Sequence, residues 1–320
     1  TVSGNSGMNG HQTNGLLMPY MFGGDVSNAW TNTGTLNLDT ALFTHVRVRV
    51  TPLAGQFADL TVVKLLANPS RRSRIYITSD DGYMSWFVYA LPLLQARGLV
   101  SSVAVIPPAV GASSLYMGLS QLREFVAAGH ECVTHGPQDG TGSLIDNYTT
   151  NAERVADMVA QRQWIQDNGL FTSEAQKRCY IWPQGKFQAS ASDQSLIEAA
   201  QAAGFTLGRS VSRFIPFSEA AAGMTTAGKM ILPIIGHSRQ TSEVNEDAEI
   251  TNITYAISYA AANGLDACLM FHKVIADQAA FSATETIEIE VSRLATILDA
   301  IVSQIGAGKM ECGLLSDMAR

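Results

Sequence analysis

Residues 75–83 read IYITSDDGY, a short apolar run that ends on two adjacent carboxylates, Asp80 and Asp81. Side chains alternate between the two faces of a strand, so these carboxylates would point to opposite sides unless the chain turns there. Gly82 follows at once and permits such a turn. Two carboxylates held close together repel each other unless a cation or a shared proton intervenes. The stretch is therefore either a polar turn that leaves a strand or the beginning of a functional site.

Strand-like and helix-like patterns alternate from residue 75 to residue 320. Short apolar runs predict strands over residues 75–78, 100–106, 132–134, 179–182, 205–207, 230–235, 267–271 and 310–314. The segments between them predict helices over residues 84–97, 119–128, 151–168, 193–203, 250–263 and 284–305. Seven or eight strands separated by helices predict an α/β fold with a parallel sheet, closed into a distorted (β/α) barrel. Such a barrel has its chemistry at the C-terminal ends of the strands.

The first 72 residues differ from the rest of the chain in composition and in hydrophobic pattern. Residues 1–35 are rich in Gly, Asn and Thr, a composition typical of loops and short irregular strands. Residues 43–52 alternate apolar and polar side chains, which predicts a half-buried strand. We therefore expect two domains, a small β-rich module over residues 1–72 and a barrel over residues 73–320. A module of this size is marginally stable alone, so we expect it to pack on the barrel.

The composition is that of an ordinary globular protein. The 320 residues are 46% hydrophobic and carry a formal net charge of −7. This acidic balance argues against a nucleic-acid partner, and no apolar run approaches the roughly 20 residues that a membrane helix needs. No signal peptide is visible. The four cysteines are far apart in the sequence and form no C-x-x-C pair, so we expect buried thiols rather than a thiolate metal site.

Chemically active side chains gather where the predicted strands end. Asp80 and Asp81 end the first strand, and three of the six histidines follow later strands, namely His135, His237 and His272. The carboxyl ends of parallel strands meet at one rim, so we expect several of these groups to lie close together. Carboxylate oxygen and imidazole nitrogen together suit a borderline metal such as zinc.

Four short motifs occur in a fixed order along the same region. They read TSDDG at residues 78–82, HGPQD at residues 135–139 after GHE, IWPQG at residues 181–185, and LMFH at residues 269–272. In order and spacing they resemble the T-F-D-D-G, H-[ST]-x-x-H, R-x-P-Y-G and L-x-x-H motifs of the polysaccharide deacetylases with the NodB homology domain, also called carbohydrate esterase family 4. The resemblance covers residues 75–320.

The resemblance implies a role for each matching residue. Asp80 would be the general base that activates a water, and His272 the general acid that protonates the leaving group. Asp81 and His135 would be ligands of a divalent metal, Zn²⁺ or another ion such as Co²⁺ or Ni²⁺. Asp139 stands where the family has a histidine as its third ligand, and a carboxylate can replace imidazole on zinc. The sequence leaves two alternatives open, a helix N-cap for Asp139 and a supporting, non-catalytic role for His272.

The third motif departs from the family pattern at two positions. Ile181 replaces the family's arginine, which holds the base carboxylate, and Gln184 replaces its tyrosine. Without that opposite charge, we expect the pKa of Asp80 to lie higher than in the family pattern. An arginine from another loop could take over the role, and the candidates are Arg209, Arg213 and Arg239.

The implied function is that of a metal-dependent hydrolase that removes N- or O-linked acetyl groups from an acetylated polysaccharide or oligosaccharide. The residues we expect to contact the sugar are Tyr83, Trp182, Gln184 and His237. Aromatic side chains at strand ends belong to the core almost as often as to a groove, and a histidine such as His237 can equally sit in a surface loop.

Two alternatives to an active hydrolase stay open. The departures from the motifs are also compatible with a carbohydrate-binding protein that has lost catalysis on the same scaffold. The β-rich module ahead of the barrel is faintly similar to some phage-tail or secreted bacterial architectures, which favours a structural or adhesive role. We therefore expect an extracellular, cell-surface or virion-associated location.

Overall fold

The computed structural model describes residues 3–4, 30–31, 72–137, 142–188, 195–213, 229–237, 243–276 and 287–319. In the region expected to form the first domain it describes only a pair of two-residue strands, β1 (Ser3–Gly4) and β2 (Trp30–Thr31), which run antiparallel. The strand expected over residues 43–52 lies outside the described residues. The boundary at residue 72 therefore stays a prediction.

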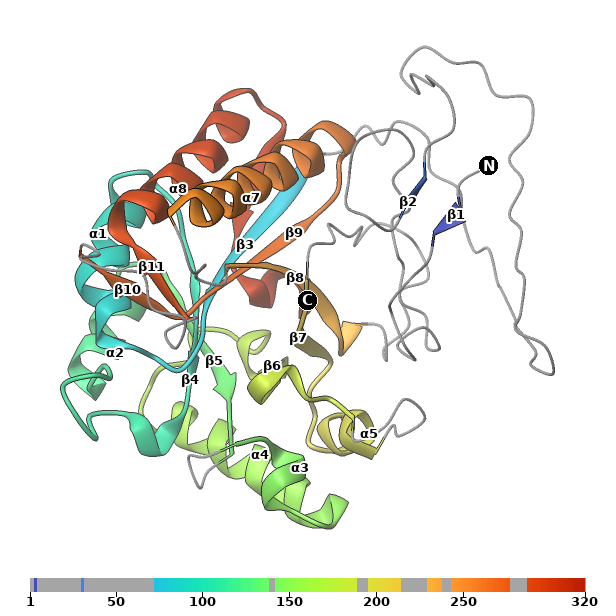
Figure 1. Ribbon diagram of the computed structural model, residues 1–320. Helices are drawn as coiled ribbons and strands as arrows, with labels where there is room; N and C mark the ends of the chain where they lie inside the picture. Colours follow the sequence, from blue (N-terminus) through green and yellow to red (C-terminus); the bar gives the residue numbers. More distant parts are fainter. Residues whose placement is uncertain are drawn as a thin grey trace.

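Seven parallel strands close into a barrel at the centre of the molecule (Figure 1). In chain order they are β3 (Ser73–Ser79), β4 (Ser102–Val105), β5 (Glu131–His135), β6 (Cys179–Ile181), β7 (Leu207–Arg213), β8 (Leu232–Gly236) and β9 (Ala267–Phe271). The barrel closes because β9 pairs back with β3, in a register that sets Ala267 beside Ile75. An eighth strand, β12 (Met310–Gly313), pairs with the first half of β3. The predicted (β/α) barrel of seven or eight strands is confirmed.

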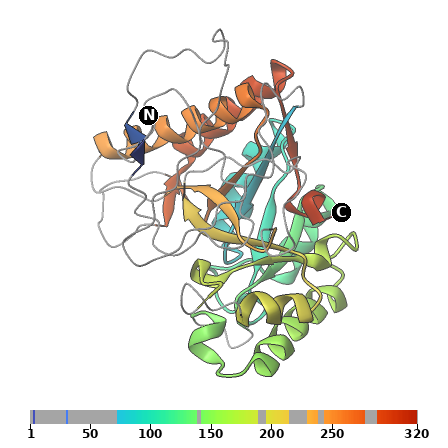
Figure 2. The same cartoon turned by 90° about the vertical axis from the view of Figure 1, so that its right-hand side faces the viewer.

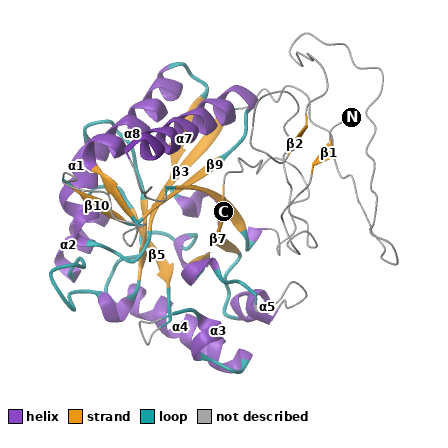
Figure 3. Cartoon of the chain, in the orientation of Figure 1, coloured by secondary structure: helices purple, strands orange, loops and turns teal. Residues whose placement is uncertain are grey.

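Helices surround the strands on the outside, as Figure 3 shows. The described ones are α1 (Leu91–Gln95), α2 (Leu119–Ala127), α3 (Leu144–Asn147), α4 (Asn151–Asp167), α5 (Ser195–Ala202), α7 (Glu243–Asn263) and α8 (Val291–Gly306). Helices α7 and α8 pack side by side, and α7 also packs on β3 and β8 (Figures 1 and 2). In the part of the chain that the structure describes, none of the helices combines the length and apolar character needed to cross a membrane.

Residues of each strand alternate between the barrel interior and the helical layer, which determines where every strand-end side chain points. The interior is one apolar cluster that includes Tyr76, Ala104, Val133, Ile181, Leu207, Ile234 and Met270. Their sequence neighbours belong to separate clusters beneath the helices. The short 3₁₀ helix η5 (Leu315–Ala319) joins the interior cluster and closes the barrel at the N-terminal ends of the strands.

Three cysteines are buried and Cys312 is half-buried, and all four are free thiols, as the sequence predicted. One described feature was not expected. Strands β10 (Lys273–Ile275) and β11 (Glu288–Glu290) form a small parallel pair directly after β9. The helix expected to begin at residue 284 therefore begins at Val291. Residues 287–290 read IEIE, and this period-two alternation is the strand signal that was missed.

Candidate active site

The two adjacent carboxylates lie in a tight turn at the C-terminal end of β3. Asp80 follows the inward-facing Tyr76 and Thr78 by alternation, and its backbone N–H donates to the Phe271 carbonyl at 2.9 Å. Asp81 has a φ of +68° and Gly82 a φ of +69°. A non-glycine residue in this left-handed region is strained by about 1–2 kcal/mol, and such strain is found mainly at functional sites. The turn therefore begins at Asp81 itself and keeps its carboxylate on the same rim as that of Asp80.

A buried arginine holds the Asp80 carboxylate. Arg209 lies in β7, is fully buried, and forms an ion pair through its Nη2 with Asp80 Oδ1. Arg209 is the register partner of Ile181 on the neighbouring strand β6. Ile181 is the position of the arginine in the family motif. The Arg209 guanidinium therefore enters the barrel at the same level, from the next strand. Of the three candidates named above, the structure places Arg209 beside Asp80, whereas the side chain of Arg213 and the whole of Arg239 lie outside the described residues.

The pKa of Asp80 is lowered, not raised, relative to its usual value. Burial raises the pKa, but the charges of Arg209, His272 and His135, together with the hydrogen bond from Arg209, outweigh burial and leave the pKa below its usual value. The expectation applied to a carboxylate without the family's arginine, and here Arg209 from the neighbouring strand supplies the opposite charge. Asp80 is therefore a carboxylate at neutral pH, the form that can accept a proton.

His135 is aligned to present its Nε2 to the Asp81 carboxylate. It is the last residue of β5 and is buried, and its Nδ1 lies 2.8 Å from the Ile181 carbonyl oxygen. The carbonyl can only accept, so Nδ1 carries the proton and neutral His135 has its lone pair on Nε2. That Nε2 lies 3.3 Å from Asp81 Oδ1. Burial lowers the pKa of His135, but Asp81 and Asp80 outweigh burial and raise it.

His272 lies near the other carboxylate oxygen of Asp80 from the one that Arg209 contacts. It follows β9, and its Nε2 lies 3.7 Å from Asp80 Oδ2, with 18% of the side chain exposed. Its backbone is fixed on both sides, because Ser79 Oγ donates to the His272 carbonyl at 3.2 Å and the next residue begins β10. Lys273 of β10 is ion-paired with Glu288 of β11. The small β10–β11 pair therefore anchors the chain directly beside His272.

Two residues expected to contact the sugar lie on the helical side of their strands. Trp182 is fully buried among apolar side chains, and its indole N–H donates to the Met230 carbonyl at 2.6 Å. His237 is 4% exposed, and its Nε2 lies 2.6 Å from Glu246 Oε1 of α7. Alternation explains both positions, because the preceding residues, Ile181 and Gly236, continue the inward-facing series. These placements differ from the groove positions that the sequence suggested.

The other two expected sugar contacts are placed differently from each other. Tyr83 is mostly buried, and its ring stacks on that of Tyr116 with centroids 5.3 Å apart. Gln184 is exposed in the turn after β6 and has a φ of +54°. Of the four expected contacts, only Gln184 therefore has an exposed side chain.

Asp81 and His135 are suited to bind a divalent metal, and the third expected ligand, Asp139, lies outside the described residues. Asp81 Oδ1 and His135 Nε2 are an oxygen and a nitrogen ligand of the kind that zinc prefers, and their 3.3 Å separation is about that of two ligands on one tetrahedral ion. Among the residues that are described, no group of three His, Cys, Asp or Glu side chains is arranged to hold a metal. The two placed residues fit a metal, and Asp139 stays a prediction.

Comparison with known proteins identifies the class. Residues 67–208 match the family model described as polysaccharide deacetylase. Over these residues the chain is similar to the polysaccharide deacetylases, the family whose motifs its sequence resembles. The match begins near the expected domain boundary and ends one residue before Arg209, while the barrel itself continues through β9.

One solved structure supports the fold, and two others were also matched. A crystal structure from Mycobacterium smegmatis that was assigned to the polysaccharide deacetylases aligns with a TM-score of 0.53 at 12% identity, over 82% of this chain and 94% of that one. A family 4 carbohydrate esterase from Streptomyces lividans aligns with a TM-score of 0.44 at 14% identity, over 77% and 94%. A deacetylase from Streptococcus pyogenes aligns with a TM-score of 0.40 at 15% identity, over 50% of this chain and 62% of that one. No curated protein matches the chain.

Arg209 is the site residue that sequence reasoning could name only as one of three. The strand around it was expected to end at residue 207, so no face could be assigned to it. With β7 extended to Arg213, Leu207 faces inward and Arg209 follows it two residues later. Alternation from Leu207 was the signal that could have singled it out.

Proposed function

We propose that this chain is a metal-dependent hydrolase that removes acetyl groups, N- or O-linked, from an acetylated polysaccharide or oligosaccharide. The observation that carries the proposal is the buried Asp80 carboxylate, which lies between Arg209 and His272 and beside the Asp81–His135 pair. The match of residues 67–208 to the polysaccharide deacetylase family model supports the same reaction class.

The residues divide into a metal-holding part and a proton-handling part. Asp81, His135 and Asp139 would hold the metal, which when bound supplies polarisation of the acetyl carbonyl and a lower pKa for a coordinated water. Zn²⁺ suits this donor set, and so do Co²⁺ and Ni²⁺. Asp80 takes the proton of the attacking water.

Arg209 and His272 complete the proton-handling part. Arg209 keeps the Asp80 carboxylate ionised and fixes its orientation, because the ion pair is buried and involves Oδ1. Oδ2 faces His272. His272 is partly exposed at the barrel mouth and gives a proton to the departing amine or alkoxide. The base and the acid then act on opposite sides of the scissile bond.

The alternative of a non-catalytic carbohydrate-binding protein rested on the departures from the family motifs, namely Asp139 in the second motif and Ile181 and Gln184 in the third. Arg209 stands beside Asp80, so the replacement of the family's arginine by Ile181 no longer favours a lost base. An extracellular, cell-surface or virion-associated location, with residues 1–72 as a docking module, remains part of the proposal.

A paired metal and activity experiment tests the proposal. Chelator-stripped protein should take up about one equivalent of Zn²⁺, and Asp81→Asn and Asp139→Asn should each weaken that uptake. Asp80→Asn and His272→Ala should retain metal but lower acetate release from an acetylated glycan panel by about 10²–10⁴-fold. His237→Asn is the matched control, because this strand-end histidine faces α7, and it should keep most of its rate per folded molecule. Stripped protein that binds no divalent ion, or an Asp80→Asn variant with full activity, would contradict the proposal.

A further inference from the structure

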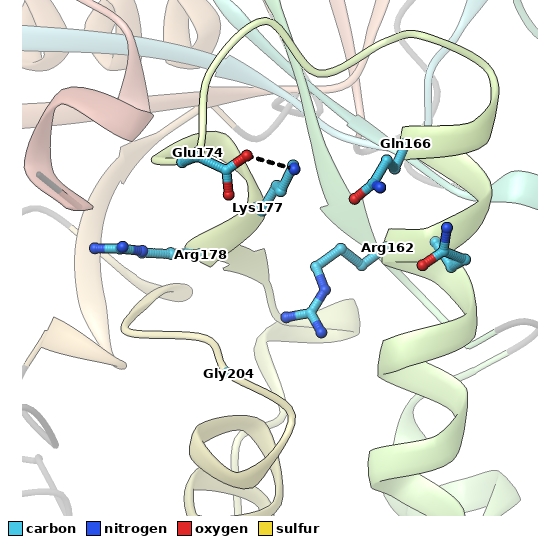
Figure 4. A pocket seen from close by; sticks show the side chains of 7 residues that line it. Arg162, Gln166, Glu174, Lys177, Arg178 and Gly204 are labelled. Carbon is cyan, nitrogen blue, oxygen red and sulfur yellow. Dashed lines mark hydrogen bonds and ion pairs between the residues drawn. The ribbon is translucent and has the colours of Figure 1, made fainter.

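A hollow of about 340 Å³ lies at the end of the barrel opposite Asp80. It is bounded by the second half of α4, by the 3₁₀ turn η3 (Gln176–Arg178) that leads into β6, and by Gly204, which precedes β7. The segments around the hollow precede the strands β6 and β7, so they lie at the N-terminal ends of the strands. The catalytic groups follow their strands and lie at the C-terminal ends. Figure 4 shows the side chains around it, with Arg162 and Gln166 on α4 and Lys177 joined to Glu174 across from them.

The hollow is positively charged although the chain is acidic. Arg162, Lys177 and Arg178 line it, with Glu174 as the single carboxylate, in a protein whose formal net charge is −7. Lys177 Nζ lies 2.6 Å from Glu174 Oε1, so that pair neutralises itself. The charges of Arg162 and Arg178 remain, and among the described residues neither has a carboxylate within ion-pair distance.

Arg162 is held in place at the wall of this hollow. Its Nη1 donates to the Ala203 carbonyl at 2.5 Å, and its guanidinium lies 5.2 Å from the centre of the Phe205 ring. A Cβ at position 204 would lie 3.0 Å from Nη1, so Gly204 leaves the room that the guanidinium occupies. Burial lowers the pKa of Arg162, and no charge partner offsets that cost. A partly buried cation without a counter-ion is unfavourable unless something else neutralises it.

We propose that this hollow binds an oxyanion group, the carboxylate of an acidic sugar in a polysaccharide. A guanidinium fixed by one nitrogen still presents donors that match a carboxylate, and Lys177 and the amide of Gln166 line the same hollow. Its volume is at the lower end of the range for small-ligand sites and suits about one sugar residue. The choice of a sugar rests on the proposed function, because only a polymer reaches both this end of the barrel and the catalytic end.

Calorimetric titration of the full chain tests this inference. Asp80→Asn protein, which should not turn over, is titrated with an oligomer of galacturonic acid, with a neutral xylo-oligosaccharide of the same length, and with inorganic phosphate. The acidic oligomer should bind, and its binding should weaken as salt increases. Arg162→Met keeps an apolar stem over Phe205 and should weaken binding about tenfold or more. Arg123→Met is the matched control, because Arg123 is exposed and does not line the hollow.

Each result supports or overturns the inference. Arg178→Gln changes an exposed side chain, so it should weaken binding without affecting folding even if Arg162→Met proves unstable. Equal binding of the acidic and neutral oligomers, or no loss of binding in these variants, would overturn it. Binding of phosphate but not of the acidic oligomer would overturn the assignment to a sugar. These titrations do not measure acetate release, so their failure is distinguishable from failure of the proposed activity.

Discussion

Asp80 and Glu131 are buried carboxylates at opposite ends of the barrel, and their surroundings shift their pKa values in opposite directions. Asp80, at the C-terminal mouth, has a lowered pKa because its electrostatic interactions with Arg209, His272 and His135, together with the hydrogen bond from Arg209, outweigh its burial. Glu131, at the N-terminal end, has a raised pKa because burial outweighs its hydrogen bonds. Its Oε1 accepts from Ser102 Oγ at 2.6 Å and from the Ser316 backbone N–H at 3.0 Å, and both donors are neutral.

The difference separates a reacting group from a structural one. A carboxylate among cations stays ionised and can accept a proton, whereas one among neutral donors favours its protonated form. Backbone geometry agrees with this division, because Asp81 at the mouth has a positive φ while Glu131 begins a regular strand. We therefore expect substitutions at the mouth to reduce activity, whereas those at the other end should change only stability and its pH dependence.

The largest effect is expected on removal of the Asp80 partner. Arg209→Met leaves a buried carboxylate without its cation and should lower the free energy of unfolding by about 3–5 kcal/mol, with loss of acetate release. Urea denaturation measures the first effect. Arg97→Met is the control, because its partner Asp299 is 64% exposed and such pairs contribute at most about 1 kcal/mol. Similar losses in the two variants would contradict the distinction.

The next largest effect concerns acid sensitivity at the N-terminal end. His130 is buried against Phe125, and its Nδ1 accepts from the Ser101 N–H at 3.1 Å. Burial lowers the pKa of His130 from 6.5 to about 4. Between pH 6.5 and about 4, His130 is protonated in the unfolded chain but not in the folded state. The contribution of neutral His130 to the free energy of unfolding is therefore complete above pH 6.5 and is lost as the pH falls towards 4.

His130→Asn tests that contribution, because the amide oxygen can accept from the Ser101 N–H without titrating. The unfolding free energy of the variant should fall less steeply with decreasing pH, by close to one proton equivalent, between pH 6.5 and about 4. Chemical denaturation at several pH values gives the slopes. Identical slopes for the two proteins would mean that His130 does not resist protonation in the folded state.

A smaller effect is expected from relief of strain in the Asp81 turn. Asp81→Gly and Asp81→Ala both remove the carboxylate, but only glycine accepts the φ of +68° without cost. In the presence of a chelator, the glycine variant should be more stable than the alanine variant by about 1–2 kcal/mol, while both lose metal uptake. Equal thermal stability of the two would show that the turn is not strained.

The smallest effect is expected at Glu131. Glu131→Gln keeps an acceptor oxygen for Ser102 and Ser316 and removes the ionisation that burial disfavours. The folded pKa is raised, so the wild-type carboxyl stabilises the fold at low pH and this contribution is lost as the pH rises. The variant should match or exceed the wild type at pH 7, with a difference that shrinks on acidification. A variant that is clearly less stable at pH 7 would contradict this.

Sequence reasoning found the fold and four side chains of the site because both follow from strand order. Asp80, Asp81, His135 and His272 come at or just after strand ends, and parallel strands bring those ends to one rim. It misplaced Trp182, because a position next to a strand end does not say which face the side chain takes.

The placement of the remaining site residues could not be predicted from the sequence, because it depends on the extent and register of the strands. Arg209 could be singled out only once β7 was known to continue beyond residue 207 and to pair with β6 at Ile181. His237 was left open between a sugar contact and a surface loop, and the inward position on that strand belongs to Gly236. Asp139 stays a prediction, because it lies outside the described residues.

Exchange of the arginine between neighbouring strands tests most directly whether the Asp80–Arg209 pair is the reacting centre. Arg209→Ile alone should abolish most acetate release. Arg209→Ile combined with Ile181→Arg returns a guanidinium to the same level of the barrel from β6, because the two positions are register partners. We predict that the double variant recovers acetate release well above the single variant. A folded double variant that is no more active than Arg209→Ile would contradict the account.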